Sequence, residues 1–134
     1  MTARNVSVSS MGYKLGQTSM QNLSGVNPDL QSVVERAIEI SEKDFTVLEG
    51  IRNVDRQKEL FKSGKSTTMN SRHLTGHAVD IAPWPISWEW EDFDPLEKAI
   101  KKAAKELKIS IVWGGDWESF PDGPHWELDW KKYP

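Results

Sequence analysis

The sequence predicts an α+β fold: a single domain in which helices pack on a small, mainly antiparallel sheet. Four short stretches have the apolar or alternating pattern of strands, and three others have the apolar spacing or capping signals of helices. These elements do not follow the regular strand–helix–strand period of a parallel sheet, which favours antiparallel pairing. The chain has 134 residues, the usual size of one domain, and contains no repeat or dividing linker. We therefore treat residues 1–134 as one domain.

Composition excludes several classes of protein. Lys+Arg 17 against Asp+Glu 20 gives a net charge of −3, which argues against a nucleic-acid-binding surface. No apolar run reaches the roughly 18 residues of a membrane span, so we expect no membrane insertion. The chain has no cysteine, which excludes disulfides, a thiol nucleophile and thiolate zinc sites. The N-terminus lacks the apolar stretch of a signal peptide, so we expect the protein to stay in the cytosol.

The first helix is expected over residues 28–42. Residues 1–12 are rich in Ser, Thr and Asn, and we expect them to be loosely ordered. Asn27 then has the character of an N-cap, and Pro28 suits the first helical position. The apolar residues that follow at helical spacing are Leu30, Val33, Val34, Ala37 and Ile38.

A strand and a second helix follow. Residues 45–48 alternate and are β-prone. Asp55 is expected to cap a helix that runs to about Phe61 and ends at Ser63 and Gly64. The stretch 66–76 is polar and turn-like, and we expect a loop there.

The second half of the chain supplies the remaining elements. Residues 78–82 predict a strand, and Trp-rich, acidic residues 84–92 connect it to the last helix. Asp94 is expected to cap that helix and Pro95 to open it. Its predicted buried stripe is Leu96, Ile100, Ala103 and Leu107. Two further strands are predicted over 109–113 and 126–130.

Three residues have the chemistry of a metal site. His73 and Asp80 flank the turn 74–76, and His125 follows a Gly-Pro pair far downstream. Two imidazoles and one carboxylate leave a fourth position open, as in catalytic rather than structural zinc sites. The spacing alone is equally compatible with the alternative, in which these histidines lie at the surface or only form hydrogen bonds. His77 lies four residues after His73, but the strand pattern that follows argues against a shared helix, so we place it beside the site and not among the ligands.

A candidate base lies near the last of these residues. Asp122 precedes His125 by three positions, and we expect the Gly-Pro pair between them to form a tight turn that aims both side chains into one cleft. A carboxylate that does not bind the metal can take a proton from activated water and pass it to a leaving amine. The alternative is an Asx-turn, in which Asp122 bonds only to its own backbone.

These motifs resemble those of a known family. Residues 71–80, SRHLTGHAVD, match the S-x-H-x-x-G-x-A-x-D signature of the D-alanyl-D-alanine carboxypeptidase (M15) family of zinc peptidases. The second motif of that family resembles Asp122-x-x-His125-x-Glu127. Residues 113–117, WGGDW, are similar to the stretch that precedes this motif in phage L-alanyl-D-glutamate peptidases. The upstream Gly-x-Arg element resembles residues 50–52, with Gln57 after it. The resemblance covers roughly residues 13–128.

The resemblance implies roles for individual residues. His73, Asp80 and His125 would bind one zinc ion per chain, and Asp122 would be the catalytic base. Arg52 would hold the substrate carbonyl and the oxyanion formed from it, a contribution of about 3 kcal/mol. Zinc is favoured by the resemblance, because the ligand set alone also suits other first-row ions.

Further residues are expected to support the ligands or contact the substrate. The alternative for Arg52 is a surface ion pair with Glu49 or Asp55, and for Glu127 a position facing water. The supporting or substrate-contacting set is Ser71, Thr75, Gln57, Trp113, Trp126 and Glu127.

Aromatic and acidic residues complete the expectations. Trp113, Trp117 and Trp126 are expected to line a groove for a peptide or sugar. Trp84, Trp88 and Trp90 are instead expected to cover the core beneath a loop. The acidic residues 89–94 are expected to form a solvated loop and a helix cap, with a calcium site as the alternative.

The expected function is that of a phage endolysin, a zinc endopeptidase that cuts the L-Ala-D-Glu bond of the peptidoglycan stem peptide during host lysis. We expect a Hedgehog/D-Ala-D-Ala-peptidase-like fold, a monomer without a separate wall-binding domain, residence in the host cytoplasm, and release by a holin. The alternatives are a D,D-carboxypeptidase or dipeptidase acting on D-Ala termini, and a non-catalytic, Hedgehog-like zinc-binding module.

Overall fold

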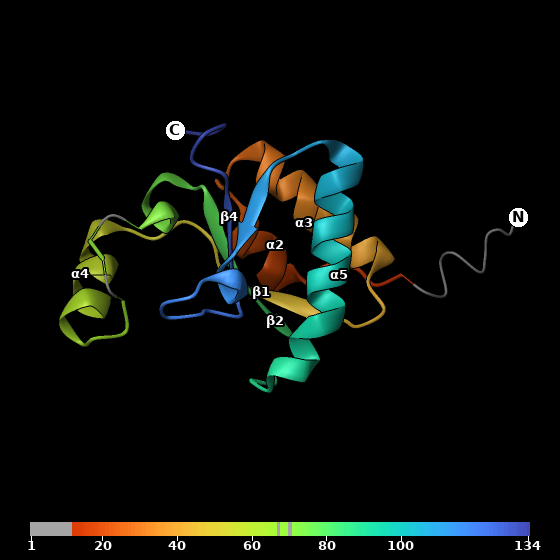
Figure 1. The fold of residues 1–134 in the computed structure, drawn as a ribbon, viewed down its shortest axis with the longest axis horizontal. Coiled ribbons are helices and arrows are strands. Elements are labelled where there is room, and N and C mark those ends of the chain that lie inside the picture. The colour runs from red at the N-terminus through yellow and green to blue at the C-terminus, as the bar shows by residue number, and fades with distance from the viewer. Residues whose placement is uncertain (1–11, 67, 70) are drawn as a thin grey trace, which may run out of the picture.

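A four-stranded antiparallel sheet organises the computed structural model (Figure 1). The structure describes residues 12–66, 68–69 and 71–134, so all but the last residue of the predicted loose segment 1–12 lies outside the described residues. The strands are β1 (Phe45–Glu49), β2 (Ala78–Pro83), β3 (Ile111–Trp113) and β4 (His125–Leu128). They lie in the order β1-β2-β4-β3, and every neighbouring pair is antiparallel. The predicted α+β class is confirmed.

Successive residues of the central strands serve opposite faces of the sheet, as strand geometry requires. In β2, Val79 and Ile81 are fully buried in the hydrophobic core, and Asp80 between them lines a cleft. In β4, Trp126 and Leu128 belong to the core. Their neighbours on β4 line the cleft instead. The two strands therefore separate a core face from a functional face.

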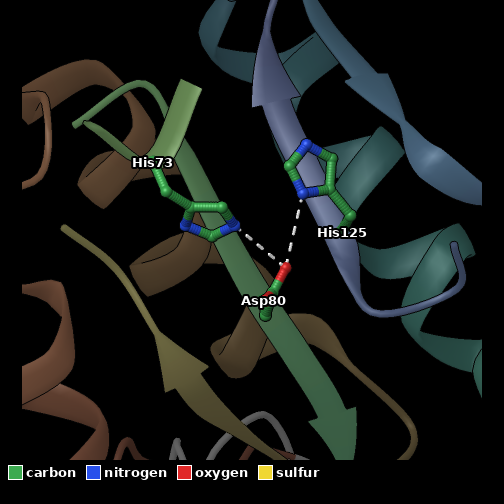
Figure 2. A group of neighbouring side chains, drawn as sticks. All are labelled: His73, Asp80 and His125. Atoms are coloured by element: carbon green, nitrogen blue, oxygen red, sulfur yellow. Dashed lines mark hydrogen bonds and ion pairs between the residues drawn. The ribbon is translucent and has the colours of Figure 1, made fainter. Parts of the chain in front are cut away.

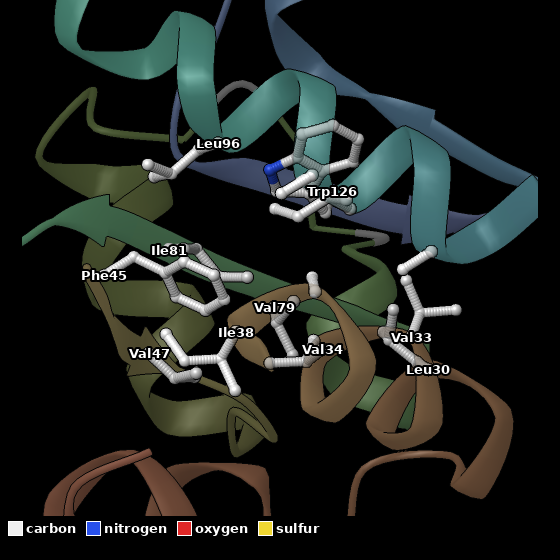
Figure 3. Close-up of a cluster of buried hydrophobic side chains, with 14 of the residues drawn as sticks. Leu30, Val33, Val34, Ile38, Phe45, Val47, Val79, Ile81, Leu96 and Trp126 are labelled. Atoms are coloured by element: carbon white, nitrogen blue, oxygen red, sulfur yellow. The ribbon is translucent and has the colours of Figure 1, made fainter. Parts of the chain in front are cut away.

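The core face is covered by two helices that pack against each other, α3 and α5 (Figures 1 and 3). Helix α3 (Pro28–Ile40) begins as expected, because the Asn27 side chain accepts a hydrogen bond from the backbone N–H of Asp29. It ends two residues before the predicted boundary. Its buried residues are those of the predicted stripe: Leu30, Val33, Val34, Ala37 and Ile38.

Helix α5 (Trp90–Leu107) begins four residues before the predicted cap at Asp94, so Pro95 lies inside the helix. Tertiary packing explains the early start: Phe93 is buried in the core, and Trp90 contacts the rings of Phe93 and Trp113. The predicted burial of Leu107 is wrong, since this last residue of the helix is exposed.

The cleft face carries helix α4 (Val54–Lys62). Asn53, and not Asp55, is its N-cap, because the Asn53 side chain accepts from the backbone N–H of Arg56. The helix ends at the predicted place, with Ser63 as the C-cap. Within the predicted loop 66–76, the chain forms a short 3-10 helix, η1 (Arg72–Thr75). A second one, η2 (Gly114–Asp116), follows β3.

Helix α2 (Gln17–Leu23) was not predicted, because it is short and buries only two of its residues. It covers the outer edge of β1, where no further strand pairs within the described residues, and its side chains form hydrogen bonds with the backbone of β1. The Ser19 hydroxyl accepts from the backbone N–H of Val47, and Asn22 donates to the carbonyls of Val47 and Leu48. An edge strand that is satisfied in this way is not free to pair with another chain.

The remaining differences concern strand ends and tryptophans. Strand β3 begins two residues after the predicted start, and β4 runs from His125 to Leu128 instead of 126–130. Trp84, Trp88 and Trp90 are largely exposed, with exposed fractions of 52%, 60% and 51%, and of these three Trp90 contacts the core rings of Phe93 and Trp113. No helix in the described part of the chain is long and apolar enough to span a membrane.

Candidate metal centre

His73, Asp80 and His125 converge on the cleft face of the sheet (Figure 2). His73 Nε2 lies 3.2 Å from Asp80 Oδ1, and His125 Nδ1 lies 3.4 Å from the same oxygen. One ligand atom from each residue lies within 4.8 Å of the others, and both histidines are buried. Among the described residues, no other group meets this criterion.

Sheet register and one turn position these three side chains. Asp80 and His125 are directly paired residues of β2 and β4, so both point to the same face. His73 comes from η1, which begins where the Ser71 hydroxyl accepts from the backbone N–H of His73. Gly76 ends η1 with a φ of 76°, a left-handed conformation that favours glycine. The chain then enters β2 at once.

Hydrogen bonds on the outer side of each imidazole determine which nitrogen faces the centre. His73 Nδ1 lies 2.7 Å from the carbonyl oxygen of Gly50, which can only accept, so Nε2 is left with a free lone pair. His125 Nε2 lies 2.7 Å from Glu127 Oε1, which leaves Nδ1 facing Asp80. Such contacts orient metal-binding histidines and raise their basicity.

Mutual electrostatic interactions shift the pKa values of the clustered groups. Burial raises the pKa of Asp80, but its hydrogen bonds with His125 and His73 outweigh burial and hold that pKa well below its usual range. Burial lowers the pKa of His125, yet the carboxylates of Asp80 and Glu127 outweigh it and raise the pKa to about 9. A divalent cation would satisfy the same negative charge and displace this proton.

The donor set fits a catalytic metal ion. Two imidazole nitrogens and one carboxylate oxygen are available, and the centre faces a cleft of about 950 Å³. Three protein ligands with one open side is the arrangement of catalytic sites. The three residues can therefore bind a metal ion and leave a position for water or substrate.

Arg52 lies where it could contact a substrate carbonyl, and it also forms one of the two ion pairs considered as alternatives. It does pair with Glu49, though not with Asp55, and the pair is not at the surface, since Arg52 is only 9% exposed and lines the cleft. Its Nη1 donates to Gln57 Oε1 at 2.7 Å, and its Nη2 lies 3.7 Å from Asp80 Oδ2. Buried Gln57 thus holds the guanidinium at the edge of the centre.

Asp122 lies in the same cleft, where its backbone packs closely against the backbone of Gly114. Its N–H donates to the carbonyl of Gly114 at 2.9 Å, and a Cβ at Gly114 would lie 2.5 Å from the Asp122 carbonyl oxygen. Within the described residues, its carboxylate accepts no hydrogen bond, so an Asx-turn is not formed. Partial desolvation by the cleft walls and the charge of Asp80 raise the Asp122 pKa, against the opposing charges of His125, His73 and Arg52.

Glu127 has a partner that the sequence analysis missed. Trp130 Nε1 donates to Glu127 Oε2 at 2.8 Å, while the other carboxylate oxygen contacts His125. The guanidinium of Arg72 lies 4.1 Å from the centre of the Trp130 ring and donates to the carbonyls of Leu128 and Tyr133. Cation–π packing thus secures the residue that orients Glu127. Only the tertiary structure brings Arg72 and Trp130 together.

Other expected residues lie away from the centre. Thr75 Oγ1 contacts His77 Nδ1 at 2.6 Å, and neither residue lines the cleft. Trp113 and Trp126 do not line a groove: they stack on each other within the core. Figure 3 shows Trp126 among the core side chains. Of the three tryptophans expected there, Trp117 does line the cleft, next to His125.

The acidic segment at the start of α5 does not form a cation site. Asp92 Oδ2 accepts from the Ser87 hydroxyl at 2.5 Å, and these residues form the connection and first turn of the helix. Within the described residues, the three-ligand criterion is not met by residues 89–94. The structure therefore does not support the calcium alternative.

The fold and the site define a class of protein. An antiparallel sheet that presents two histidines and one aspartate to an open cleft, beside an unpaired carboxylate and a buried guanidinium, has the composition of a metal-dependent hydrolase centre.

Comparisons with known proteins identify the family. The family model of phage L-alanyl-D-glutamate peptidases matches residues 11–131, so the chain belongs to this family and is a peptidase. It is 39% identical to the L-alanyl-D-glutamate peptidase of Escherichia phage T5 over 119 residues, which cover 84% of this chain and 87% of that protein. It is also 33% identical to the peptidoglycan L-alanyl-D-glutamate endopeptidase CwlK of Bacillus subtilis over 102 residues, 63% of this chain and 60% of that one.

Solved structures agree on the fold. The crystal structure of the Serratia marcescens L-Ala D-Glu endopeptidase ChiX matches with a TM-score of 0.86 and 42% identity, covering 91% of this chain and 94% of that one. The vancomycin resistance D,D-dipeptidase VanXYg matches with a TM-score of 0.51 and 15% identity, over 77% of this chain and 50% of that one. The second likeness shows the fold alone. The predicted peptidase fold is confirmed.

Proposed function

We propose that this protein is a zinc-dependent endopeptidase that hydrolyses the L-Ala-D-Glu bond in the stem peptide of peptidoglycan. The observation that carries the proposal is the joint position of the His73, Asp80 and His125 group and of Asp122 and Arg52 in one open cleft. Family membership supports the choice of scissile bond, since the relatives from phage T5, B. subtilis and S. marcescens are named for it.

His73 Nε2, His125 Nδ1 and an oxygen of Asp80 would hold one zinc ion per chain. When bound, zinc supplies Lewis-acid activation of the scissile carbonyl and of water. The choice of zinc rests on the nitrogen and carboxylate donors and on the family. Gly50 and Glu127 keep the two imidazoles in the tautomers that leave these nitrogens free.

Asp122 and Arg52 provide the chemistry of the chain itself. The Asp122 carboxylate takes a proton from the attacking water on one of its oxygens and returns it to the amine that leaves with D-Glu. In the metal-free protein, burial and the charge of Asp80 raise the Asp122 pKa, which makes this carboxylate a stronger base than an exposed aspartate. The Arg52 guanidinium stabilises the negative charge that develops on the carbonyl oxygen, and Gln57 holds it in place.

The test is digestion of purified peptidoglycan by the protein, with and without a chelator, followed by mass spectrometry of the new termini. New L-Ala C-termini and D-Glu N-termini that disappear on chelation and return with zinc are expected. Release of D-Ala would instead identify a D,D-carboxypeptidase. Stoichiometric zinc without any cleavage would identify a Hedgehog-like binding module.

We propose the biological setting from the same family membership. The protein would act as an endolysin and would work as a monomer. It would stay in the host cytoplasm until a holin opens the membrane, and then reach the cell wall.

A further inference from the structure

The cleft that contains the metal centre has two chemically different walls. One wall comes from α4 and the loop after it, and there Arg56 and Lys65 line the cleft with exposed side chains. The other comes from the loop after η2, where Trp117 and Phe120 line it. Phe120 is 75% exposed and has a φ of 53°, so a large apolar ring is held in the open cleft by a backbone conformation that is rare for such a residue.

The two cations of the α4 wall have no side-chain hydrogen bond or ion pair among the described residues. Arg52 is neutralised by Glu49, and Arg72 is engaged with two carbonyls and Trp130. In contrast, neither Arg56 nor Lys65 makes a side-chain hydrogen bond or ion pair within the described residues. Within the described residues, two positive charges therefore face the cleft without a directly bonded side-chain partner, on one side of the centre.

The proposed substrate is charged on one side of its scissile bond. The glutamate that contributes the amino group to an L-Ala-D-Glu bond has two carboxyl groups, and only one of them can carry the next residue of the peptide. The other is a free carboxylate close to the bond that breaks. The alanine on the other side of the bond contributes only a methyl group.

Resting on the proposed function, we propose that Arg56 and Lys65 form the subsite for the free carboxylate of the D-Glu residue. The guanidinium can bind a carboxylate through two parallel hydrogen bonds, and the lysine adds a point charge. This contact sets the direction of the peptide in the cleft, with D-Glu along α4 and L-Ala toward Trp117 and Phe120. Because the two side chains are exposed, salt weakens the contact.

The experiment compares two synthetic stem peptides that differ only at this group. One has the free D-Glu carboxylate, and the other has the corresponding neutral carboxamide. The zinc-loaded wild-type protein is expected to cleave the carboxylate peptide with a kcat/KM about tenfold higher, mainly through KM, and high salt should reduce the difference. The double variant Arg56→Gln, Lys65→Gln should cleave both peptides at the rate of the carboxamide peptide.

The matched control is Lys58→Gln, which removes one positive charge from the same helix at a position that does not line the cleft. It should keep the wild-type preference. Equal cleavage of the two peptides by the wild type, or an unchanged preference in the double variant, would overturn the subsite and leave the endopeptidase activity intact. Cleavage of neither peptide by zinc-loaded wild type would instead refute the proposed function, and with it the subsite.

Discussion

Asp80 and His125 are paired residues on the adjacent strands β2 and β4, and both face the cleft while their strand neighbours face the core. The packing that stabilises the fold therefore also sets the spacing of two of the three candidate ligands. Val79 and Ile81 on one strand, and Trp126 on the other, are almost completely buried. A shift of either strand by one residue would turn its ligand away from the cleft and separate it from the ligand on the other strand.

Replacing His73 by Ala should abolish stoichiometric zinc binding, because two protein ligands would remain of three. Zinc content after dialysis, measured by elemental analysis, checks this. His77→Ala is the matched control, since His77 lies four residues away and contacts Thr75 instead of the centre. A His73→Ala protein that keeps one zinc ion per chain would show that the ligand set is different.

Replacing Asp122 by Asn should reduce kcat by about 100-fold or more while zinc content stays at the wild-type level, because the amide cannot accept the proton from water. Peptide-cleavage assays measure the loss of kcat, and elemental analysis of the same variant measures the retained zinc. Because only the ionised carboxylate can accept the proton, wild-type activity should fall on the acid side as Asp122 becomes protonated. Unimpaired cleavage by the variant would remove Asp122 from the mechanism.

Replacing Glu127 by Gln should weaken zinc binding by about 10- to 100-fold, because the carboxylate that accepts from His125 Nε2 is lost. Trp130→Phe removes only the indole donor to Glu127 and should have a smaller effect in the same direction. Competition with a zinc-binding dye measures both affinities. Affinities equal to that of the wild type would mean that Glu127 does not tune the centre.

Metal-free protein should lose stability as pH rises from 6.5 to 9. The pKa of His125 is raised to about 9 in the folded state, so its stabilising pairing with Asp80 and Glu127 is complete below the ordinary pKa of 6.5 and is lost as pH rises through 9. The depressed pKa of Asp80 has the opposite sign: its contribution is present above 3.8 and is lost below it. Denaturant unfolding across this range tests the prediction. His125→Asn should remove the alkaline loss, and His77→Ala should retain it.

Replacing Gly50 by Ala should destabilise the protein by about 1–3 kcal/mol, because a Cβ at this position would overlap the carbonyl oxygen of Asn22 and contact Val26. It should also weaken zinc binding, since the displaced Gly50 carbonyl accepts from His73 Nδ1. Thermal unfolding and zinc titration provide the two readouts. Gly16→Ala is the control, since a Cβ there has nothing within 4 Å. A Gly50→Ala protein as stable as the wild type would show that α2 can move away from the added Cβ without loss of folding free energy.

Local signals in the sequence were enough for the elements that are long or well capped. Asn27 and Pro28 identified the start of α3, and its apolar spacing identified the buried face. Where long-range packing decides, local signals failed: α5 starts at Trp90 because aromatic rings pack there, before the cap signal at Asp94. Helix α2 has little apolar periodicity and is held by hydrogen bonds to β1.

The sequence by itself determined the α+β class, the family, and the group of His73, Asp80 and His125 that converges in the cleft, because these depend on motif spacing and on residue chemistry. Only the tertiary structure decided which imidazole nitrogens face the centre, since this depends on Gly50 and Glu127. It also decided that Trp126 belongs to the core while Trp130 supports the site. Such contacts join residues that are distant along the chain, and local sequence patterns do not encode them.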